Sequence, residues 1–296
     1  MEYIALGCMS GTSLDGIDCS LIKSDGVSYV NEISNEYIPY SDELQLKLHN
    51  VILKGYLADI KVINQLNQEY KDSINYFIKK NNLEIDLIAM HGQTVYHDQK
   101  TKISIQLFDK SIRFNTHSPI ICNFRKNDLL NGGNGAPIMP EFHRVLANQL
   151  GLKKVIFVNI GGVTNITVID NQKITAGDSS FGNAIVNDLI YEKTKERFDV
   201  DGSLSNNGQK IDDLFKYITS DDYFLENLPK SLDRNFFHKY LDNFIKERKL
   251  NNSIYTLLEV IPFAINSLIS SQSDFKIILM GGGRKNLTLQ KIFKNY

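Results

Sequence analysis

The sequence predicts a two-lobed α/β protein with mixed sheets flanked by helices, and three observations support this class. The chain has 296 residues, and single hydrophobic cores stop growing at roughly 250 to 300 residues. A strand, a turn of small residues, a second strand and then helices follow one another twice along the chain. Between the repeats, residues 131–137 contain too much glycine for the interior of a helix or strand. We therefore expect one lobe over residues 1–130 and another over residues 131–296.

The first lobe is expected to open with three strands, at residues 2–8, 17–24 and 27–33, whose short connections imply an antiparallel meander. Apolar residues then recur at three- and four-residue steps from Asp59 to Lys80, which predicts one long amphipathic helix. Residues 85–90 predict a buried strand that ends at His91-Gly92-Gln93-Thr94. Polar side chains just beyond a strand's carboxyl end are typical of ligand sites in α/β sheets.

The second lobe repeats this order. We expect strands at residues 154–159 and 164–169, joined by a turn at Gly161-Gly162, and a late strand at residues 275–280 that leads into Gly281-Gly282-Gly283. The expected helices cover residues 183–194, 208–219, 236–248 and 253–271.

Composition excludes several classes of function. Lys plus Arg (33) nearly balances Asp plus Glu (34), so no global basic field is available to hold nucleic acid or an anionic membrane. Three widely spaced cysteines, Cys8, Cys19 and Cys122, argue against a disulfide framework and a zinc site. No leader pattern follows Met1, and no apolar run approaches the roughly 20 residues of a membrane helix. We expect a soluble, cytoplasmic protein without nucleic-acid or membrane partners, and a homodimer stays open.

The segment from Gly7 to Asp18 has the composition of a phosphate loop, because it joins two apolar runs through glycines, hydroxyls and carboxylates. Backbone N–H groups at Gly11 and Gly16, with the Thr12 and Ser13 hydroxyls, suit phosphate oxygens. Asp15 or Asp18 suits a hydrated divalent cation. The loop connects strand to strand, and no lysine follows its second glycine, so it is not a Walker A loop. An ordinary tight hairpin is the alternative for this segment taken alone.

Five motifs in order carry a resemblance to a known family: residues 7–18, 91–94, 132–137, 159–165 and 281–286. Together they resemble the motifs of the anhydro-N-acetylmuramic acid kinase family, which lies in the actin-like ATPase superfamily with the acetate and sugar kinases. The resemblance implies two ribonuclease H-like lobes with a nucleotide cleft between them. It also implies ATP- and Mg²⁺-dependent conversion of 1,6-anhydro-N-acetylmuramic acid to N-acetylmuramic acid 6-phosphate, an amino-sugar step of peptidoglycan recycling.

The resemblance also implies site residues. Asp178 matches the general base that deprotonates the water opening the anhydro bridge. The implied nucleotide residues are Gly11, Thr12, Ser13, Leu14, Asp15, Gly16, Ile17 and Asp18 in the first lobe, and Gly161, Gly162, Asn165, Gly281, Gly282 and Gly283 in the second. The candidate sugar residues are His91, Gln93 and Asn134, with Arg125 facing the lactyl carboxylate.

Several alternatives stay open. Asp178 is also suited to cap the helix that begins near Asn183, and Gly281 to Gly283 are also typical of a simple strand exit. Ser180-Phe181 stands where the resemblance implies Gly-Pro, and family members are expected to continue beyond the position of Tyr296. A nucleotide-binding pseudokinase with a regulatory or assembly role is therefore the second hypothesis.

Overall fold

The computed structural model describes all of the chain except residues 12–13, 54–57, 99–100, 234–235, 242–247 and 270–273. The described residues divide into two compact units, Met1–Ile138 and Met139–Tyr296. Each unit contains one sheet of mixed strand direction. The glycine-rich segment 131–137, which we expected to open the second lobe, falls within the first unit.

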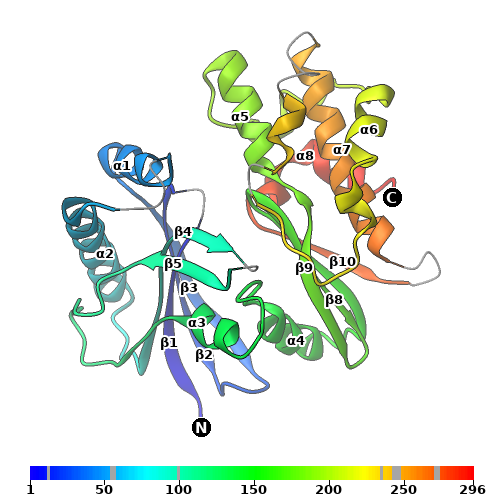
Figure 1. Ribbon diagram of the computed structural model, residues 1–296. Coiled ribbons are helices and arrows are strands. Elements are labelled where there is room, and N and C mark those ends of the chain that lie inside the picture. Colours follow the sequence, from blue (N-terminus) through cyan, green and yellow to red (C-terminus); the bar gives the residue numbers. More distant parts are fainter. Residues whose placement is uncertain (12–13, 54–57, 99–100, 234–235, 242–247, 270–273) are drawn as a thin grey trace. The chain divides into compact units, whose positions relative to one another are not determined.

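The first unit is built on a sheet of strand order β3-β2-β1-β4-β5, with β6 also pairing with β4. The first three strands form the expected antiparallel meander, and β4 runs parallel to β1. Figure 1 shows α1 and α2 together beside this sheet. The elements are β1 (Tyr3–Ser10), β2 (Gly16–Ser24), β3 (Val30–Pro39), α1 (Asp42–Leu53), α2 (Ile60–Asn81), β4 (Leu87–Asp98), β5 (Ile103–Leu107), β6 (Ile120–Ile121) and α3 (Phe124–Leu130).

The predicted long helix is confirmed as α2. Asp59 caps its amino end by accepting a hydrogen bond from the Lys61 N–H at 2.9 Å. The apolar stripe faces inward, since four of its side chains are fully buried: Leu66, Tyr70, Ile74 and Phe77. This stripe belongs to the core of the first unit.

The third strand begins later than predicted, at Val30 rather than residue 27. The Asp25 carboxylate accepts hydrogen bonds from the N–H groups of Val27, Ser28 and Tyr29 at 2.8–2.9 Å. An aspartate that binds its own following backbone in this way favours a turn over a strand. Residues 27–29, which we expected in the strand, therefore belong to the turn before it.

The second unit repeats the topology of the first. Its sheet has the order β10-β7-β8-β9, which corresponds to β4-β1-β2-β3: three antiparallel strands and a fourth that runs parallel to the first. This repeated order confirms the predicted two-lobed, ribonuclease H-like α/β fold. The elements are α4 (Pro140–Gln149), β7 (Lys154–Ile160), β8 (Val163–Asp170), β9 (Lys173–Phe181), α5 (Asn183–Thr194), α6 (Asp212–Thr219), α7 (Leu250–Leu268), β10 (Lys276–Met280) and α8 (Leu287–Phe293).

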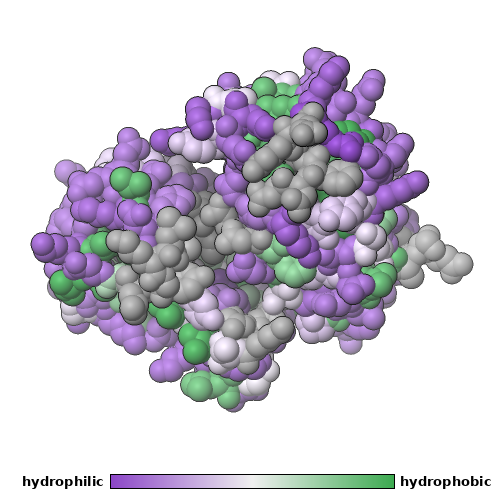
Figure 2. Space-filling model, turned by 45° about the horizontal axis from the view of Figure 1, so that its top comes forward, coloured by the Kyte–Doolittle hydropathy of each residue, from purple (hydrophilic) through white to green (hydrophobic). Residues whose placement is uncertain are grey.

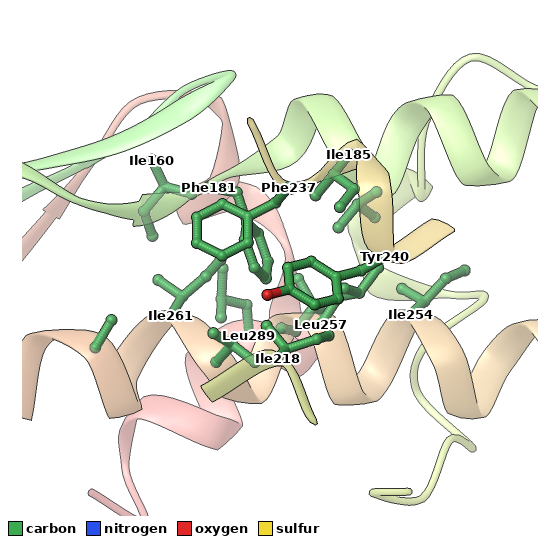
Figure 3. Packing of buried hydrophobic residues seen from close by; sticks show 14 of the residues in the cluster. Ile160, Phe181, Ile185, Ile218, Phe237, Tyr240, Ile254, Leu257, Ile261 and Leu289 are labelled. Carbon is green, nitrogen blue, oxygen red and sulfur yellow. The ribbon is translucent and has the colours of Figure 1, made fainter. Parts of the chain in front are cut away.

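Helices cover both faces of this second sheet. Alternate residues of β7 serve the two faces, as the two-residue period of a strand requires. Val155 and Phe157 pack with Ala147 of α4, while Ile156 and Val158 join the larger core beneath α7. Figure 3 shows Ile160 and Phe181 of the sheet meeting Leu257 and Ile261 of α7 in that core.

Two expectations for the second unit need correction, and one strand was missed. The helix predicted at 208–219 begins at Asp212, because the N–H groups of Gln209 and Ile211 donate to the side chains of Asn252 and Thr256 on α7 instead of forming a helical turn. The start of the helix predicted at 236–248 is a 3-10 turn, Phe236–His238, and residues 242–247 lie outside the described part. Strand β9 was not predicted, although it contains Asp178.

Figure 2 shows hydrophilic residues over most of the face that it draws, with hydrophobic residues in small groups between them.

Among the helices of the described residues, none combines the length and the apolar character that crossing a bilayer demands.

Candidate functional site

The predicted phosphate loop of the first unit is a hairpin between β1 and β2, which pair antiparallel from Tyr3 opposite Ser24 to Met9 opposite Asp18. Leu14 donates from its N–H to the Gly11 carbonyl at 3.3 Å, and its side chain is buried. The Asp15 carbonyl accepts from the N–H of Tyr40 at 2.9 Å. Gly16 and Ile17 are the first residues of β2. Thr12 and Ser13 lie outside the described residues.

The carboxylates of Asp15 and Asp18 provide negative charge on this loop. Both residues are solvent-exposed overall. Partial desolvation raises the pKa of Asp18, and the negative charge of Asp15 raises it further. A second carboxylate close enough to act in this way fits a hydrated Mg²⁺, which takes one or two protein carboxylates together with substrate phosphates. No group of three or more acidic, His or Cys side chains in the described part of the chain forms a complete metal cage.

Strand β4 does not end at His91, as we had predicted, but continues to Asp98. It passes from parallel pairing with β1 to antiparallel pairing with β5, and this second partner extends the strand. The motif His91-Gly92-Gln93-Thr94 therefore lies inside a strand, where His91 and Gln93 are both buried. The polar side chains that we expected beyond a strand end are held in the sheet.

Two of the candidate sugar residues, His91 and Arg125, are hydrogen-bonded to each other. The Arg125 guanidinium donates from Nε to Nε2 of His91 at 3.0 Å and from Nη1 to the Gly135 carbonyl at 2.7 Å. Nδ1 of His91 lies 2.8 Å from the Gly92 carbonyl, which accepts its proton. Burial, and then the charge of Arg125, lowers the pKa of His91 to about 4. Neutral His91 therefore orients Arg125, and the half-buried Asn134 lies beside Gly135 in sequence.

Gln93 was predicted to contact sugar, and the structure places it elsewhere. Its side chain is fully buried. Nε2 donates to the Gly11 carbonyl at 2.6 Å and to the Thr94 carbonyl at 3.1 Å, while Oε1 accepts from the Tyr40 hydroxyl at 3.2 Å. Both amide protons are used within the first unit, and one of them is donated to the Gly11 carbonyl, where β1 leads into the hairpin.

In the second unit, the turn at Gly161-Gly162 covers the amino end of α5. The Gly161 carbonyl accepts from the N–H of Asn183 at 2.7 Å, and the Gly162 carbonyl accepts from the N–H of Gly182 at 3.0 Å. The residue at the N-cap position of α5 is Gly182. The alternative that Asp178 caps this helix is therefore wrong.

Asp178 lies in a polar row that crosses the second sheet. Asn165 on β8 is paired with Asn159 on β7 and with Asp178 on β9, and directly paired residues share one face of a sheet. All three side chains are half-buried. Sequence reasoning missed Asn159, although its position at the end of a buried strand, before the Gly-Gly turn, was a usable signal.

Four contacts fix the Asp178 residue on its strand and its carboxylate in place. Its N–H donates to the Lys230 carbonyl at 2.9 Å, and its carbonyl accepts from the Tyr223 hydroxyl at 2.7 Å. Oδ2 accepts from the N–H of Leu232 at 2.8 Å, and β8 pairs with the strand on the other side. One carboxylate oxygen is thus held by a backbone donor, which pre-orients the group that the resemblance assigns as the base.

The replacement at Ser180-Phe181 does not fill the space around this carboxylate. Phe181 is buried in the core of the second unit, with its ring 5.1 Å from that of Phe237. The Ser180 hydroxyl is also buried and donates to the Phe181 carbonyl at 2.8 Å. The bulk added at this position therefore contributes to packing.

The glycine run after β10 packs against the end of β7 and is more than a loose strand exit. Gly281 has φ +73°, and a Cβ placed on it would lie 2.6 Å from Oδ1 of Asn159 and 2.7 Å from the Ile160 carbonyl. Only glycine combines this backbone conformation with such a close approach. Because β10 and β7 are parallel, their carboxyl ends bring Gly281 and Gly161 to the same edge of one sheet.

Comparison with known proteins decides the family. The family described as anhydro-N-acetylmuramic acid kinase matches residues 2–295. The chain belongs to the anhydro-N-acetylmuramic acid kinase family. An anhydro-N-acetylmuramic acid kinase of Pelagibacter ubique is 33% identical to it, over 98% of this chain and 82% of the relative. One of Rhodopseudomonas palustris is 31% identical, over 99% of this chain and 84% of the relative.

Among solved structures, component A of (R)-2-hydroxyglutaryl-CoA dehydratase from Acidaminococcus fermentans aligns with a TM-score of 0.49 and 9% identity, over 99% of this chain and 88% of that chain. Family membership makes this protein a kinase, a phosphotransferase that acts on an amino sugar.

Proposed function

We propose that the protein uses ATP to convert 1,6-anhydro-N-acetylmuramic acid into N-acetylmuramic acid 6-phosphate in peptidoglycan recycling. The observation that carries this proposal is the family match over residues 2–295, together with an Asp178 carboxylate held by the Leu232 N–H. Nothing in the described part of the chain favours the pseudokinase alternative, because Ser180 and Phe181 pack into the core. Cytoplasmic location and a homodimer stay predictions.

Every bond and proton of the proposed reaction can be accounted for. Water attacks the anomeric carbon, and Asp178 takes the proton that the water loses. The bond between that carbon and O6 breaks, and its electron pair goes to O6, which attacks the γ-phosphorus of ATP. The bond to the β-phosphate oxygen breaks, and ADP leaves. An aspartate is a weak base at a reference pKa of about 3.9, so positioning must contribute most of the rate enhancement.

Residues of both units would hold the nucleotide. From the first unit, the loop from Gly11 to Asp18 would contact the phosphates, and Asp15 and Asp18 would hold Mg²⁺ through water. From the second, Gly161, Gly162 and Asn165 would contact the phosphates, with Gly281 to Gly283 near the adenosine. Bound Mg²⁺ would supply positive charge to the phosphate oxygens. A nucleotide cleft between the units stays a prediction.

Residues of the first unit would recognise the sugar. His91 stays neutral near pH 7 and orients Arg125, which carries the positive charge suited to the lactyl carboxylate. Asn134 offers an amide to the hydroxyl or acetamido groups. Gln93 is left out of this proposal because its carboxamide donates to the Gly11 carbonyl.

The deciding experiment incubates the protein with Mg-ATP and the anhydro sugar and follows the 6-phosphate by mass spectrometry. Asp178→Asn should lose product formation while it still binds Mg-ATP. Asp170→Asn is the matched control, because Asp170 is the last residue of β8, away from the Asn165 that pairs with Asp178, and forms a partly exposed ion pair with Lys154. Undiminished product from the Asp178 variant would contradict its role as base. A folded wild-type protein that binds Mg-ATP but forms no product would support the pseudokinase.

A further inference from the structure

A bulge in β4 separates two buried polar side chains that a regular strand would place on one face. Cys8 of β1 pairs with Met90 and Ser10 pairs with Gln93, so the intervening Met9 lies opposite two residues of β4. One of the two is Gly92, which has φ +79°. Bulges change the direction of side chains and are frequent next to functional sites. Here His91 contacts Arg125, whereas Gln93 contacts the phosphate loop.

Gln93 ends a buried chain of hydrogen bonds that begins on helix α2. The Tyr70 hydroxyl lies 3.0 Å from the Ser10 hydroxyl, which lies 2.7 Å from the Tyr40 hydroxyl, which in turn lies 3.2 Å from Oε1 of Gln93. The Ser10 hydroxyl accepts from both tyrosines, and the Tyr40 hydroxyl also lies 3.2 Å from that of Tyr70, so the three hydroxyls form one connected buried cluster next to Oε1 of Gln93. Nε2 of Gln93 then donates to the Gly11 carbonyl at 2.6 Å.

The chain of hydrogen bonds therefore leads from helix α2 to the backbone of Gly11, where the hairpin begins. All four side chains are at least 96% buried, so their hydrogen bonds are formed away from water and reinforce one another. Gly11 is the residue at which β1 gives way to the hairpin. A second anchor holds the other side of the hairpin, where the N–H of Tyr40 donates to the Asp15 carbonyl at 2.9 Å.

We propose that Gln93 is a positioning residue that fixes the backbone of the phosphate loop for Mg-ATP, and that it does so from the strand that also carries the sugar-site residue His91. This inference rests on the proposed function, because it assumes that the loop binds the phosphates. An amide side chain suits both neighbours, since Nε2 donates to the Gly11 carbonyl while Oε1 lies within hydrogen-bond distance of the Tyr40 hydroxyl. Gln93 contacts no reacting atom and acts through Gly11.

The test compares Gln93→Met with Gln106→Met. Methionine keeps the length and unbranched shape of glutamine but has no donor. Gln106 is the matched control, because it lies on the neighbouring strand β5 and donates to the Ser104 hydroxyl at 2.7 Å without reaching the loop. Mg-ATP affinity is measured by calorimetry without sugar, and KM for each substrate and kcat are measured in the coupled kinase assay. Gln93→Glu is the second variant, since it keeps the acceptor for Tyr40 and removes both donors.

Gln93→Met and Gln93→Glu should bind Mg-ATP at least tenfold more weakly and raise KM for ATP equally, while KM for the sugar stays within twofold. Gln106→Met should match wild type. Folded Gln93 variants with unchanged Mg-ATP affinity would overturn the inference, whether or not the enzyme is active. A different pair of results would separate the two proposals. If the wild type does not phosphorylate the anhydro sugar but the Gln93 variants still bind Mg-ATP more weakly than the wild type, the inference holds and the proposed function is wrong.

Discussion

Acidification should weaken the first unit through a single buried histidine. Burial and the neighbouring Arg125 lower the pKa of His91 in the folded protein from 6.5 to about 4. Between these values the unfolded chain binds a proton that the folded chain does not, so the free energy of unfolding falls as pH falls. Through His91, the free energy of unfolding should fall by about 2 kcal/mol at pH 5 and by about 3 kcal/mol below pH 4. Above pH 6.5 the contribution is fully present.

Urea unfolding at pH 8, 7, 6 and 5 measures this effect, followed by far-UV circular dichroism because the chain has no tryptophan. His91→Gln cannot take up the proton and should lose this part of the pH dependence. His117→Gln is the matched control, since His117 is an exposed histidine of the same unit. If wild type and His91→Gln lose stability in parallel between pH 8 and pH 5, the assignment of a neutral, buried His91 is wrong.

Three further tests, one of them with a matched control, concern the backbone, the packing and the hydrogen bonds around the candidate site. Gly92→Ala should destabilise the protein by about 1–3 kcal/mol in urea unfolding, because φ is +79° at that bulge; an unchanged midpoint would count against the bulge. Phe237→Ala should lower the free energy of unfolding by about 3–5 kcal/mol, since Phe237 is only 1% exposed. Phe236→Ala is the control and should lower it clearly less, because Phe236 is 40% exposed. Equal losses for the two variants would contradict the packing of Phe237 in the core. Tyr223→Phe removes the hydrogen bond to the Asp178 carbonyl and should lower kcat with KM for ATP unchanged, which steady-state kinetics would check.

Much of the fold could be predicted from local sequence patterns. The stripe on α2 and the strands β1, β2, β7, β8 and β10 were visible because apolar residues recur with the period of their element. Strand β9 was not, because its residues from Gly177 to Ser180 are small or polar and its pairing with β8 is decided by tertiary contacts. The end of β4 was misplaced for the same reason, since the second half of this strand is largely polar and its extension to Asp98 depends on pairing with β5.

The candidate site was less predictable than the fold. Motifs identified which segments carry polar residues, but they did not indicate which way each side chain is directed. Gln93 illustrates this, because a one-residue bulge at Gly92 gives it different partners from His91, two positions away. Asn159 was not among the predicted site residues. Strand register pairs it with Asn165, which is in turn paired with Asp178, so the three residues form one row across the sheet.

The repeated strand order suggests a common rule for the two glycine turns. In each unit, the turn follows the first strand of the meander, and a parallel neighbour strand supports its backbone. In the first unit β4 does this through the Gln93 side chain, which binds the Gly11 carbonyl. In the second unit β10 does it through backbone contact, because Gly281 lies against Asn159 and Ile160 at the end of β7. If the turns bind the phosphates as we propose, substitutions at these supporting positions, far from the turns in sequence, should weaken phosphate binding.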